Sequence, residues 1–299
     1  MALVNYATNY LQALQQKFAA QLSFNALYNS PNNANIRFVN AKTIQIPRLS
    51  VGGFVDVDRD TVGEFSRRVD NDWETKTLEH DREFRTLVDP MDIDETNMAL
   101  SIANITSVFN DEQKIPEMDK YMASKLYAEY TDLGGEPVEA DVTADNILAQ
   151  FDTLMEKMDE AEVPQEGRIM YVTPKVNTAL KTAQGRALVA ANNGTLNRSI
   201  YDIDSVTIEV VPTSRMKTMY NFTDGAVADE SAGQITMILI HPSAVISPMK
   251  YEFVSLDQPS ARTGGKYLYY ERKYWDVFLV ENKLAGVEIL VAPAAPAGE

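Results

Sequence analysis

The chemistry open to this chain is limited first by its two histidines, His80 and His241. His80 and Glu83 have the spacing of a partial metal pair, but on the strand predicted there they point to opposite faces, so a surface histidine is expected. His241 follows an apolar run, so we expect an ordinary hydrogen bond at a strand end. A Ser-His-Asp triad could use Ser243, but no nucleophile-elbow sequence surrounds a serine. We therefore assign no catalytic residue.

Three further patterns that could bind or transform a ligand have simpler interpretations. Gly264, Gly265 and Lys266 resemble a phosphate loop, but the Walker spacing and the following Ser or Thr are missing, so a turn is predicted. The 43 carboxylates guarantee close pairs by chance and nominate no glycosidase or two-metal site. Aromatic residues near the C-terminus lack interleaved basic residues, which favours sheet core over base stacking. The sequence predicts no cofactor and no metal site.

Composition narrows the class of protein. The 299 residues are 45% hydrophobic and 23% charged, as in globular proteins, and the absence of cysteine excludes disulfides and thiolate sites. No apolar run approaches the roughly 18 residues of a membrane span, and no signal peptide is recognisable. The net charge is −16, yet the first acidic residue is Asp56. An acidic body disfavours a dedicated nucleic-acid binder and suits either a container wall or an abundant soluble protein.

The first part of the chain shows two features that need a partner. An apolar stripe over residues 2–24 predicts an amphipathic helix, which the polar stretch 29–35 separates from the rest. That stripe must be buried against the body or a partner chain. Alternation over 36–86 predicts a long hairpin with a return limb at 73–85. Because the hairpin has little apolar area, we expect it to lie across a neighbouring subunit, with an edge of the chain's own sheet as the alternative.

The remainder alternates helices and strands. A helical stripe through Phe109 resumes after Pro116, which can start a second helix or kink the first, and it ends at Gly134 and Gly135. Thr143 is predicted to cap the next helix. Strands are expected at 168–172, 206–211 and 234–240, a helix from Pro174 to Gly185, an aromatic antiparallel sheet over 251–280, and a loose tail over 292–299.

This order of elements resembles the major capsid proteins of tailed bacteriophages and is most similar to those of siphoviruses that infect Gram-positive bacteria. The resemblance covers nearly the whole chain and depends on order and spacing, because no single motif is specific. The residues that carry it are Trp73–Thr75, Asp81–Phe84, Asp94–Thr96, Ile115–Asp119, and the closing stretch from Met237 through His241, Pro242, Ala244 and Val245 to Tyr274–Asp276.

The resemblance implies an α+β protein with the HK97-type capsid fold. The implied parts are an N-terminal arm (1–35), an extended loop hairpin (36–90), the spine-helix part of a peripheral domain (91–141), an axial domain (142–242), and the return sheet of the peripheral domain with the C-terminal tail (243–299). A loop between Met219 and Gly233, with Thr223, Asp224 and Gly225, would point at the hexamer or pentamer axis. Inter-subunit contacts are hypothesised for Phe54, Arg59, Phe65, Arg67, Arg68 and Trp73.

The implied function is structural and not enzymatic. The protein would self-assemble through hexamers and pentamers into an icosahedral head around double-stranded phage DNA, which it would bind without sequence specificity. Other partners would be a portal and, where one is used, a separate scaffolding protein, because the chain has no room for a cleaved scaffolding segment. The protein would reside in the virion, after assembly in the host cytoplasm away from membranes. The alternatives are an encapsulin-like shell of the same fold and, less favoured, an α/β hydrolytic enzyme.

Two experimental consequences follow from these expectations. Arg67→Glu combined with Arg68→Glu should block shell formation and leave a folded subunit. Deleting residues 2–30 should leave the folding of the body largely intact and impair assembly. No motif places the Lys–Asn cross-link that joins subunits in some relatives.

Overall fold

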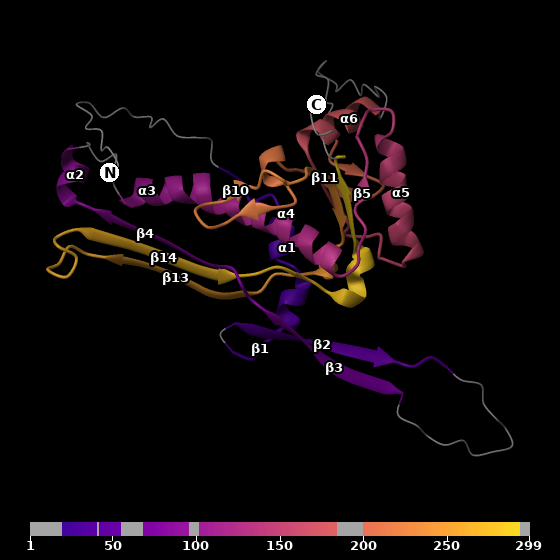
Figure 1. The fold of residues 1–299 in the computed structure, drawn as a ribbon, viewed down its shortest axis with the longest axis horizontal. Coiled ribbons are helices and arrows are strands. Elements are labelled where there is room, and N and C mark those ends of the chain that lie inside the picture. The colour runs from indigo at the N-terminus through magenta and orange to yellow at the C-terminus, as the bar shows by residue number, and fades with distance from the viewer. Residues whose placement is uncertain (1–19, 41, 55–67, 96–101, 184–199, 294–299) are drawn as a thin grey trace, which may run out of the picture.

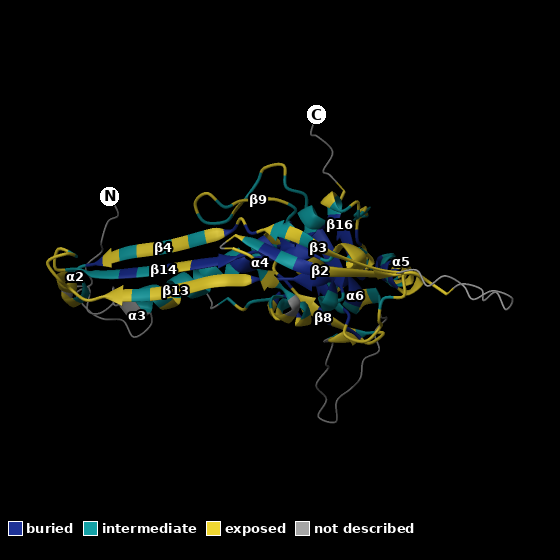
Figure 2. Ribbon diagram, turned by 90° about the horizontal axis from the view of Figure 1, so that it is seen from below, coloured by how far each residue is buried: buried dark blue, intermediate teal, exposed yellow. Residues whose placement is uncertain are grey.

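The computed structural model describes residues 20–40, 42–54, 68–95, 102–183 and 200–293. Within them the molecule has three parts (Figure 1). A body at one end is built on a six-stranded sheet, a long three-stranded sheet extends from it beneath a long helix, and a two-stranded hairpin projects away from both. Most residues of the hairpin strands are exposed (Figure 2).

The six-stranded sheet forms the core of the body in the order β5-β16-β11-β6-β8-β7. Its strands are β5 (Val138–Glu139), β6 (Ile169–Val172), β7 (Asp202–Ile203), β8 (Val206–Val210), β11 (Ile235–Ile240) and β16 (Val287–Val291). Every residue of β11 is buried, because both faces of this strand are covered. Met237 and Leu239 pack with α5 (Ile147–Glu160) and α6 (Pro174–Ala183), whereas Ile238 and Ile240 pack with the long helix.

The positions of these elements agree closely with those predicted from the sequence. The strands predicted at 168–172, 206–211 and 234–240 are confirmed to within one residue, and α6 starts at Pro174 as predicted. Helix α5 starts after Asn146 and not at Thr143, whose N–H donates to the Asn146 side chain at 2.8 Å. Gly185, the predicted end of α6, lies outside the described residues.

The long helix consists of α3 (Ile102–Phe109), a π-helical turn, η2 (Asn110–Lys114), and α4 (Ile115–Asp132). Pro116 stands in the first turn of α4, where the wider turn before it accommodates a residue that has no N–H to donate. The helix ends as predicted, with Gly134 at φ +87° and the Gly135 N–H donating to the Tyr130 carbonyl at 2.8 Å.

The long sheet has the order β13-β14-β4, with β13 (Met249–Asp257), β14 (Tyr267–Trp275) and β4 (Asp81–Val88). The helix covers one face, where Phe84 stacks on Phe109 at 3.9 Å and Lys114 pairs with Glu271. In Figure 2 the middle strand β14 is largely buried, whereas β13 is exposed along almost its whole length. The prediction that the C-terminal aromatic residues form sheet core is therefore confirmed for β14 and wrong for β13.

Strand pairing corrects two assignments made from the sequence. The hairpin consists of β2 (Thr43–Val51) and β3 (Val69–Thr77), so the prediction that its return limb continues to Arg85 is wrong. Strand β4 pairs with β14 of the same chain, as the alternative interpretation had it. Strand β16, assigned to the return sheet, instead pairs with β11 and β5 in the body. The domain boundaries themselves stay predictions.

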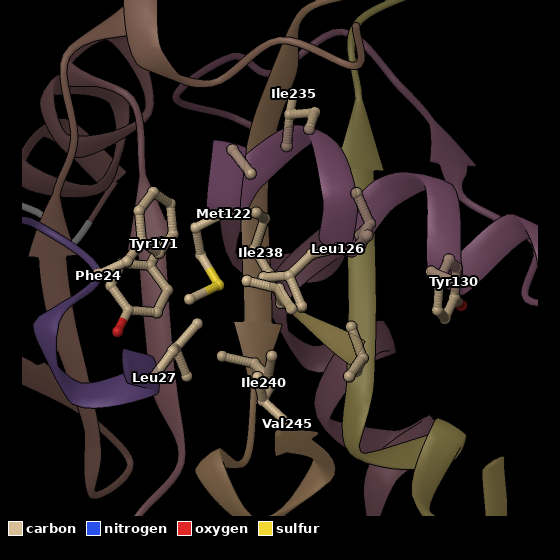
Figure 3. Close-up of a cluster of buried hydrophobic side chains, with 14 of the residues drawn as sticks. Phe24, Leu27, Met122, Leu126, Tyr130, Tyr171, Ile235, Ile238, Ile240 and Val245 are labelled. Atoms are coloured by element: carbon tan, nitrogen blue, oxygen red, sulfur yellow. The ribbon is translucent and has the colours of Figure 1, made fainter. Parts of the chain in front are cut away.

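Residues 24–28, which lie inside the predicted arm (1–35), contribute to the core of the subunit. Phe24, just before α1 (Asn25–Tyr28), and Leu27 are fully buried beside Met122 and Tyr171 (Figure 3). The helix predicted over 2–24 falls mostly outside the described residues, and its last residues, 20–24, are not helical. Because Phe24 and Leu27 fill the core, the structure contradicts the expectation that deleting residues 2–30 spares the body.

Short elements complete the connections. They are α2 (Pro90–Glu95), β1 (Arg37–Phe38), β9 (Tyr220–Asn221), β10 (Val227–Ala228), β12 (Val245–Ile246), β15 (Phe278–Leu279), and the 3-10 turns η1 (Pro31–Asn35), η3 (Thr213–Arg215), η4 (Pro242–Ala244) and η5 (Glu281–Gly286). Ser30 caps η1 and also donates to the Val245 carbonyl at 2.6 Å, which ties the chain entry to β12.

Candidate functional site

The root of hairpin β2–β3 is packed against the body, and its outer half is not. Antiparallel pairing runs from Thr43 opposite Thr77 to Val51 opposite Val69. Near the root, Ile44 and Ile46 are buried in a small apolar cluster that also contains Leu78, Ile246, Tyr274 and Phe278. Beyond Ile46 every residue of β2 is exposed. The hairpin is therefore anchored by burial at one end, and its outer residues are exposed.

One face of the outer hairpin is apolar and open to solvent. Strand register places Pro47 opposite Trp73, Leu49 opposite Asn71 and Val51 opposite Val69, so these side chains share one face, on which Asn71 is the polar member. Leu49 is 63% exposed, Val51 66% and Trp73 42%. A contiguous apolar face on a two-stranded ribbon is typical of a surface that another chain covers.

The other face of the hairpin is charged. It carries Arg48, Asp70 and Asp72, which are all exposed. Arg48 pairs with Glu281 of η5 at 2.9 Å, a contact in which both side chains are about half exposed. Since the polar face suits water and the apolar face does not, the hairpin has one side that a partner would cover.

The predicted contact residues are only partly brought together. Phe54 is fully exposed, Arg68 is exposed, and Trp73 lies on the apolar face. Arg68 closes the ladder, because its carbonyl accepts from the Gly52 N–H at 2.8 Å and its guanidinium donates to the Gly53 carbonyl at 3.3 Å. The remaining candidates, Arg59, Phe65 and Arg67, lie outside the described residues.

A second open apolar surface lies on the sheet face away from the long helix. The rings of Tyr251 and Phe253 on β13 are stacked with their centroids 6.2 Å apart, and the Phe253 and Tyr270 ring centroids are also 6.2 Å apart. The Arg272 guanidinium lies 5.9 Å from the centroid of the Tyr251 ring. Aromatic and arginine side chains are enriched at protein interfaces. Sequence reasoning missed this surface, because alternation cannot show which strand is at the edge of a sheet.

The loop between Met219 and Gly233 lies along the helix and β4 of its own chain. The Lys120 ammonium donates to the Ala226 carbonyl at 2.6 Å, and the Arg82 guanidinium donates to the Gly225 carbonyl at 3.3 Å. Beneath the loop is a groove of about 460 Å³, lined by Asp81, Arg82, Glu83, Phe84, Phe109, Gln113, Lys114, Glu117, Thr223, Asp224, Gly225, Glu271, Lys273 and Trp275. Its position relative to a shell axis stays a prediction.

The charges of this groove are held by neighbours on the same chain. The Arg82 guanidinium donates to Glu117 at 2.6 Å, and His80 lies 3.7 Å from the same carboxylate. Burial alone would raise the pKa of Glu117, but the hydrogen bonds and charges of His80 and Arg82 hold its pKa below the usual range. Burial lowers the pKa of Lys273, against the attraction of nearby carboxylates. The charged side chains of this groove are therefore paired with one another within the subunit.

His80 is the one histidine that the sequence placed wrongly. It is only 6% exposed, because its ring stacks on Tyr121 at 3.7 Å between centroids and meets Trp275 edge-on at 4.5 Å. His241 behaves as predicted, since its Nδ1 lies 2.7 Å from Ser243 Oγ and its Nε2 lies 3.2 Å from the Glu166 carbonyl. His241 also caps η4, because its Nδ1 accepts from the Ser243 backbone N–H at 3.2 Å.

The described residues provide no recognisable metal centre. They contain no group of three or more His, Asp or Glu side chains that could hold a metal ion. Gly264 and Gly265 have positive φ values of 62° and 78° and lie in a turn between β13 and β14, as predicted. Among the described helices, none is long and apolar enough to cross a bilayer.

The fold matches solved structures of bacteriophage particles over nearly its full length. The capsid structure of cyanophage P-SCSP1u gives a TM-score of 0.69 at 13% identity, covering 97% of this chain and 93% of that chain. The mature capsid of bacteriophage PhiM1 gives 0.66 at 14% identity over 99% and 98% of the two chains. A chain of Mycobacterium phage Che8 gives 0.64 at 15% identity over 98% of each.

No protein-family model matches the sequence, and no curated protein does either. The matches to solved structures show that the chain has the α+β fold of phage capsid structures. Its details are consistent with the HK97-type fold expected from the sequence. At this low identity the likeness establishes the fold, and the function has to be argued from surfaces.

Proposed function

We propose that this chain is the major capsid protein of a tailed bacteriophage, which assembles through hexamers and pentamers into the icosahedral head around double-stranded DNA. The observation that carries the proposal is the match of the whole chain to phage capsid structures. The exposed apolar hairpin supports it, because Leu49, Val51 and Trp73 lack cover from the described residues of their own chain.

In this assembly the hairpin of each subunit would pack on the neighbouring subunit. The apolar hairpin face and the aromatic sheet face are different surfaces of one molecule, so a contact between them would be heterologous and could close into rings. Many modest contacts of this kind, each made twice by every subunit, would give a shell far more stable than any pair. In this scheme Phe54, Arg59, Phe65, Arg67, Arg68 and Trp73 contact neighbours, and the loop with Thr223, Asp224 and Gly225 approaches the axis.

The same proposal assigns the remaining partners. The shell would join a portal, would use a separate scaffolding protein where one is needed, and would enclose DNA without reading its sequence. The net charge of −16 suits such a wall, because it limits adhesion to packed phosphate. The protein would be found in the virion, after assembly in the host cytoplasm.

The two alternatives have less support. An encapsulin-like shell shares the fold, but the solved structures described above come from phages. A Ser-His-Asp hydrolase would need a carboxylate that orients the histidine. Ser243 Oγ lies 2.7 Å from His241 Nδ1, but His241 Nε2 meets the backbone carbonyl of Glu166 at the position where that carboxylate would stand. The contents of the particle, phage DNA or a cargo enzyme, would separate the first alternative from the proposal.

The test is expression of the full chain followed by negative-stain electron microscopy. Wild-type protein should form closed shells, and Leu49→Asp with Val51→Asp should abolish them while the subunit melts at an unchanged temperature. Val210→Asp is the matched control, because Val210 is an exposed strand residue of the body with similar exposure to Trp73. Shells from the hairpin variant, or a wild-type protein that stays monomeric under all assembly conditions, would contradict the proposal.

A further inference from the structure

The hairpin leaves the body through the linker Leu78–His80, and the two ends of this linker are fixed by backbone contacts. The Leu78 N–H donates to the Lys42 carbonyl at 2.7 Å, and the Leu78 carbonyl accepts from the Tyr274 hydroxyl at 2.7 Å. The His80 carbonyl accepts from the Trp275 N–H at 3.2 Å. The linker is thus held to β14 on one side and to the start of the hairpin on the other.

The middle of the linker is held by a buried carboxylate. The Glu79 N–H donates to Asp276 Oδ2 at 2.8 Å, and the Tyr121 hydroxyl donates to Asp276 Oδ1 at 2.6 Å. The Val277 N–H also donates to Oδ1, at 2.8 Å. Asp276 is fully buried, so it joins the linker, helix α4 and the end of β14 at one point.

Tyr121 is a donor that stays available to this carboxylate. Burial raises the pKa of Tyr121, and the charge of Asp276 raises it further, so the hydroxyl stays protonated and can donate. The ring of Tyr121 also stacks on His80, which brings the last linker residue under the same control. A buried carboxylate that lost a donor would pay a desolvation penalty, so the linker is strongly favoured in this one position.

The geometry of the hairpin makes the root position consequential. Nine-residue strands rise by about 30 Å in total, and a tilt of about 10° at the root would move the far end by about 5 Å. Beyond the root, Arg48–Glu281 is an exposed ion pair of little strength. The direction of the outer hairpin is therefore decided at the root.

We propose that Asp276 is the positioning residue that fixes the angle at which hairpin β2–β3 leaves the body, and that this angle sets the curvature of the assembled shell. The first part concerns the isolated subunit and is independent of assembly. The second part rests on the proposed function.

The first part can be tested by spin labelling of unassembled subunits. The chain has no cysteine, so Ser50→Cys on the hairpin and Glu156→Cys on α5 introduce two unique labels, both at exposed positions. The distance distribution should be narrow in otherwise wild-type protein. Asp276→Asn keeps the size of the side chain but replaces an acceptor by a donor. This variant should at least double the width of the distance distribution. Tyr121→Phe is the control, because it leaves the bond between Glu79 and Asp276 in place, and it should broaden the distribution less.

Three outcomes decide the proposal. A broad distribution in the wild-type background overturns it without any variant, which covers the case in which Asp276→Asn fails to fold. An equal width in wild type and Asp276→Asn, with both folded, also overturns it. For the second part, Asp276→Asn should give particles of irregular diameter by electron microscopy, and uniform particles of wild-type diameter would contradict it. If the wild type forms no particles, the proposed function fails while the labelling result still stands.

Discussion

Strand β11 and the outer half of hairpin β2–β3 are both rich in apolar side chains, yet their surroundings are opposite. All six residues of β11 are buried between helices of the same chain. On the hairpin, Leu49, Val51 and Trp73 are exposed although they share one face. The body thus buries its apolar side chains within one subunit, whereas the outer hairpin leaves its apolar side chains exposed. Substitutions of the same type should therefore have different consequences in the two regions.

The largest difference should come from truncation of matched apolar residues. Ile238→Ala in β11 should destabilise the isolated subunit by about 2–5 kcal/mol, because a fully buried side chain leaves a cavity. Leu49→Ala should leave the free energy of unfolding within about 0.5 kcal/mol of wild type, because its site is exposed. Chemical denaturation of unassembled protein measures both. Equal losses of unfolding free energy in the two variants would contradict the claim that the body buries its apolar residues and the hairpin does not.

The segment with Phe24 and helix α1 should behave like the body. Leu27→Ala should cost about 2–3 kcal/mol, toward the lower end of the range for buried leucines, because the four-residue helix α1 can shift to fill part of the space. Asn25→Ala, an exposed change in the same helix, is the control. An unchanged melting temperature for Leu27→Ala would mean that this segment is not part of the subunit core.

Acid should weaken the region beneath the hairpin root by a smaller amount. The pKa of Glu117 is held below its ordinary 4.5, so its stabilising contribution is present above that value and is lost as the pH falls through the lowered pKa. Wild type should lose more stability on going below pH 4.5 than Glu117→Gln does. Thermal melts of unassembled protein at several pH values measure this. Parallel curves for the two proteins would show that Glu117 does not titrate as stated.

The smallest effect is expected for the surface ion pair beside the hairpin. Arg48 and Glu281 are 2.9 Å apart, but their side chains are 45% and 48% exposed. Arg48→Ala should change the free energy of unfolding by less than about 1 kcal/mol, and the change should shrink further in high salt. Denaturation at low and high salt checks this. A loss above 2 kcal/mol would mean that the hairpin is held along its length and not only at its root.

The sequence predicts best where local pattern and burial agree. Strands β6 and β11 are almost continuous apolar runs, and β8 alternates apolar with polar residues. Gly134 and Gly135 mark the end of α4, so these elements were placed almost correctly. The fold class was predicted from the resemblance to phage capsid proteins, which the order and spacing of such elements carry. Exposed surfaces were harder, because alternation alone does not reveal whether a strand such as β13 lies at a sheet edge.

The errors have a common physical origin in distant contacts. The stretch from Trp73 to Arg85 is dense in charge on both sides of the linker and its alternation is imperfect throughout, so nothing local marks the point where the chain leaves the hairpin for β14. His80 is buried by Tyr121 and Trp275, which are far away in the chain. The pairing of β16 with β11 likewise depends on the tertiary fold.

The central claim is that the outer hairpin is covered by sister subunits, and Trp73 reports on it directly. The chain has two tryptophans, of which Trp275 is 3% exposed and Trp73 is 42% exposed. Acrylamide quenching of fluorescence should detect one accessible tryptophan in unassembled subunits and none in assembled particles, with Trp73→Phe identifying the signal. Quenching of Trp73 that is equally strong in both fractions would contradict the account.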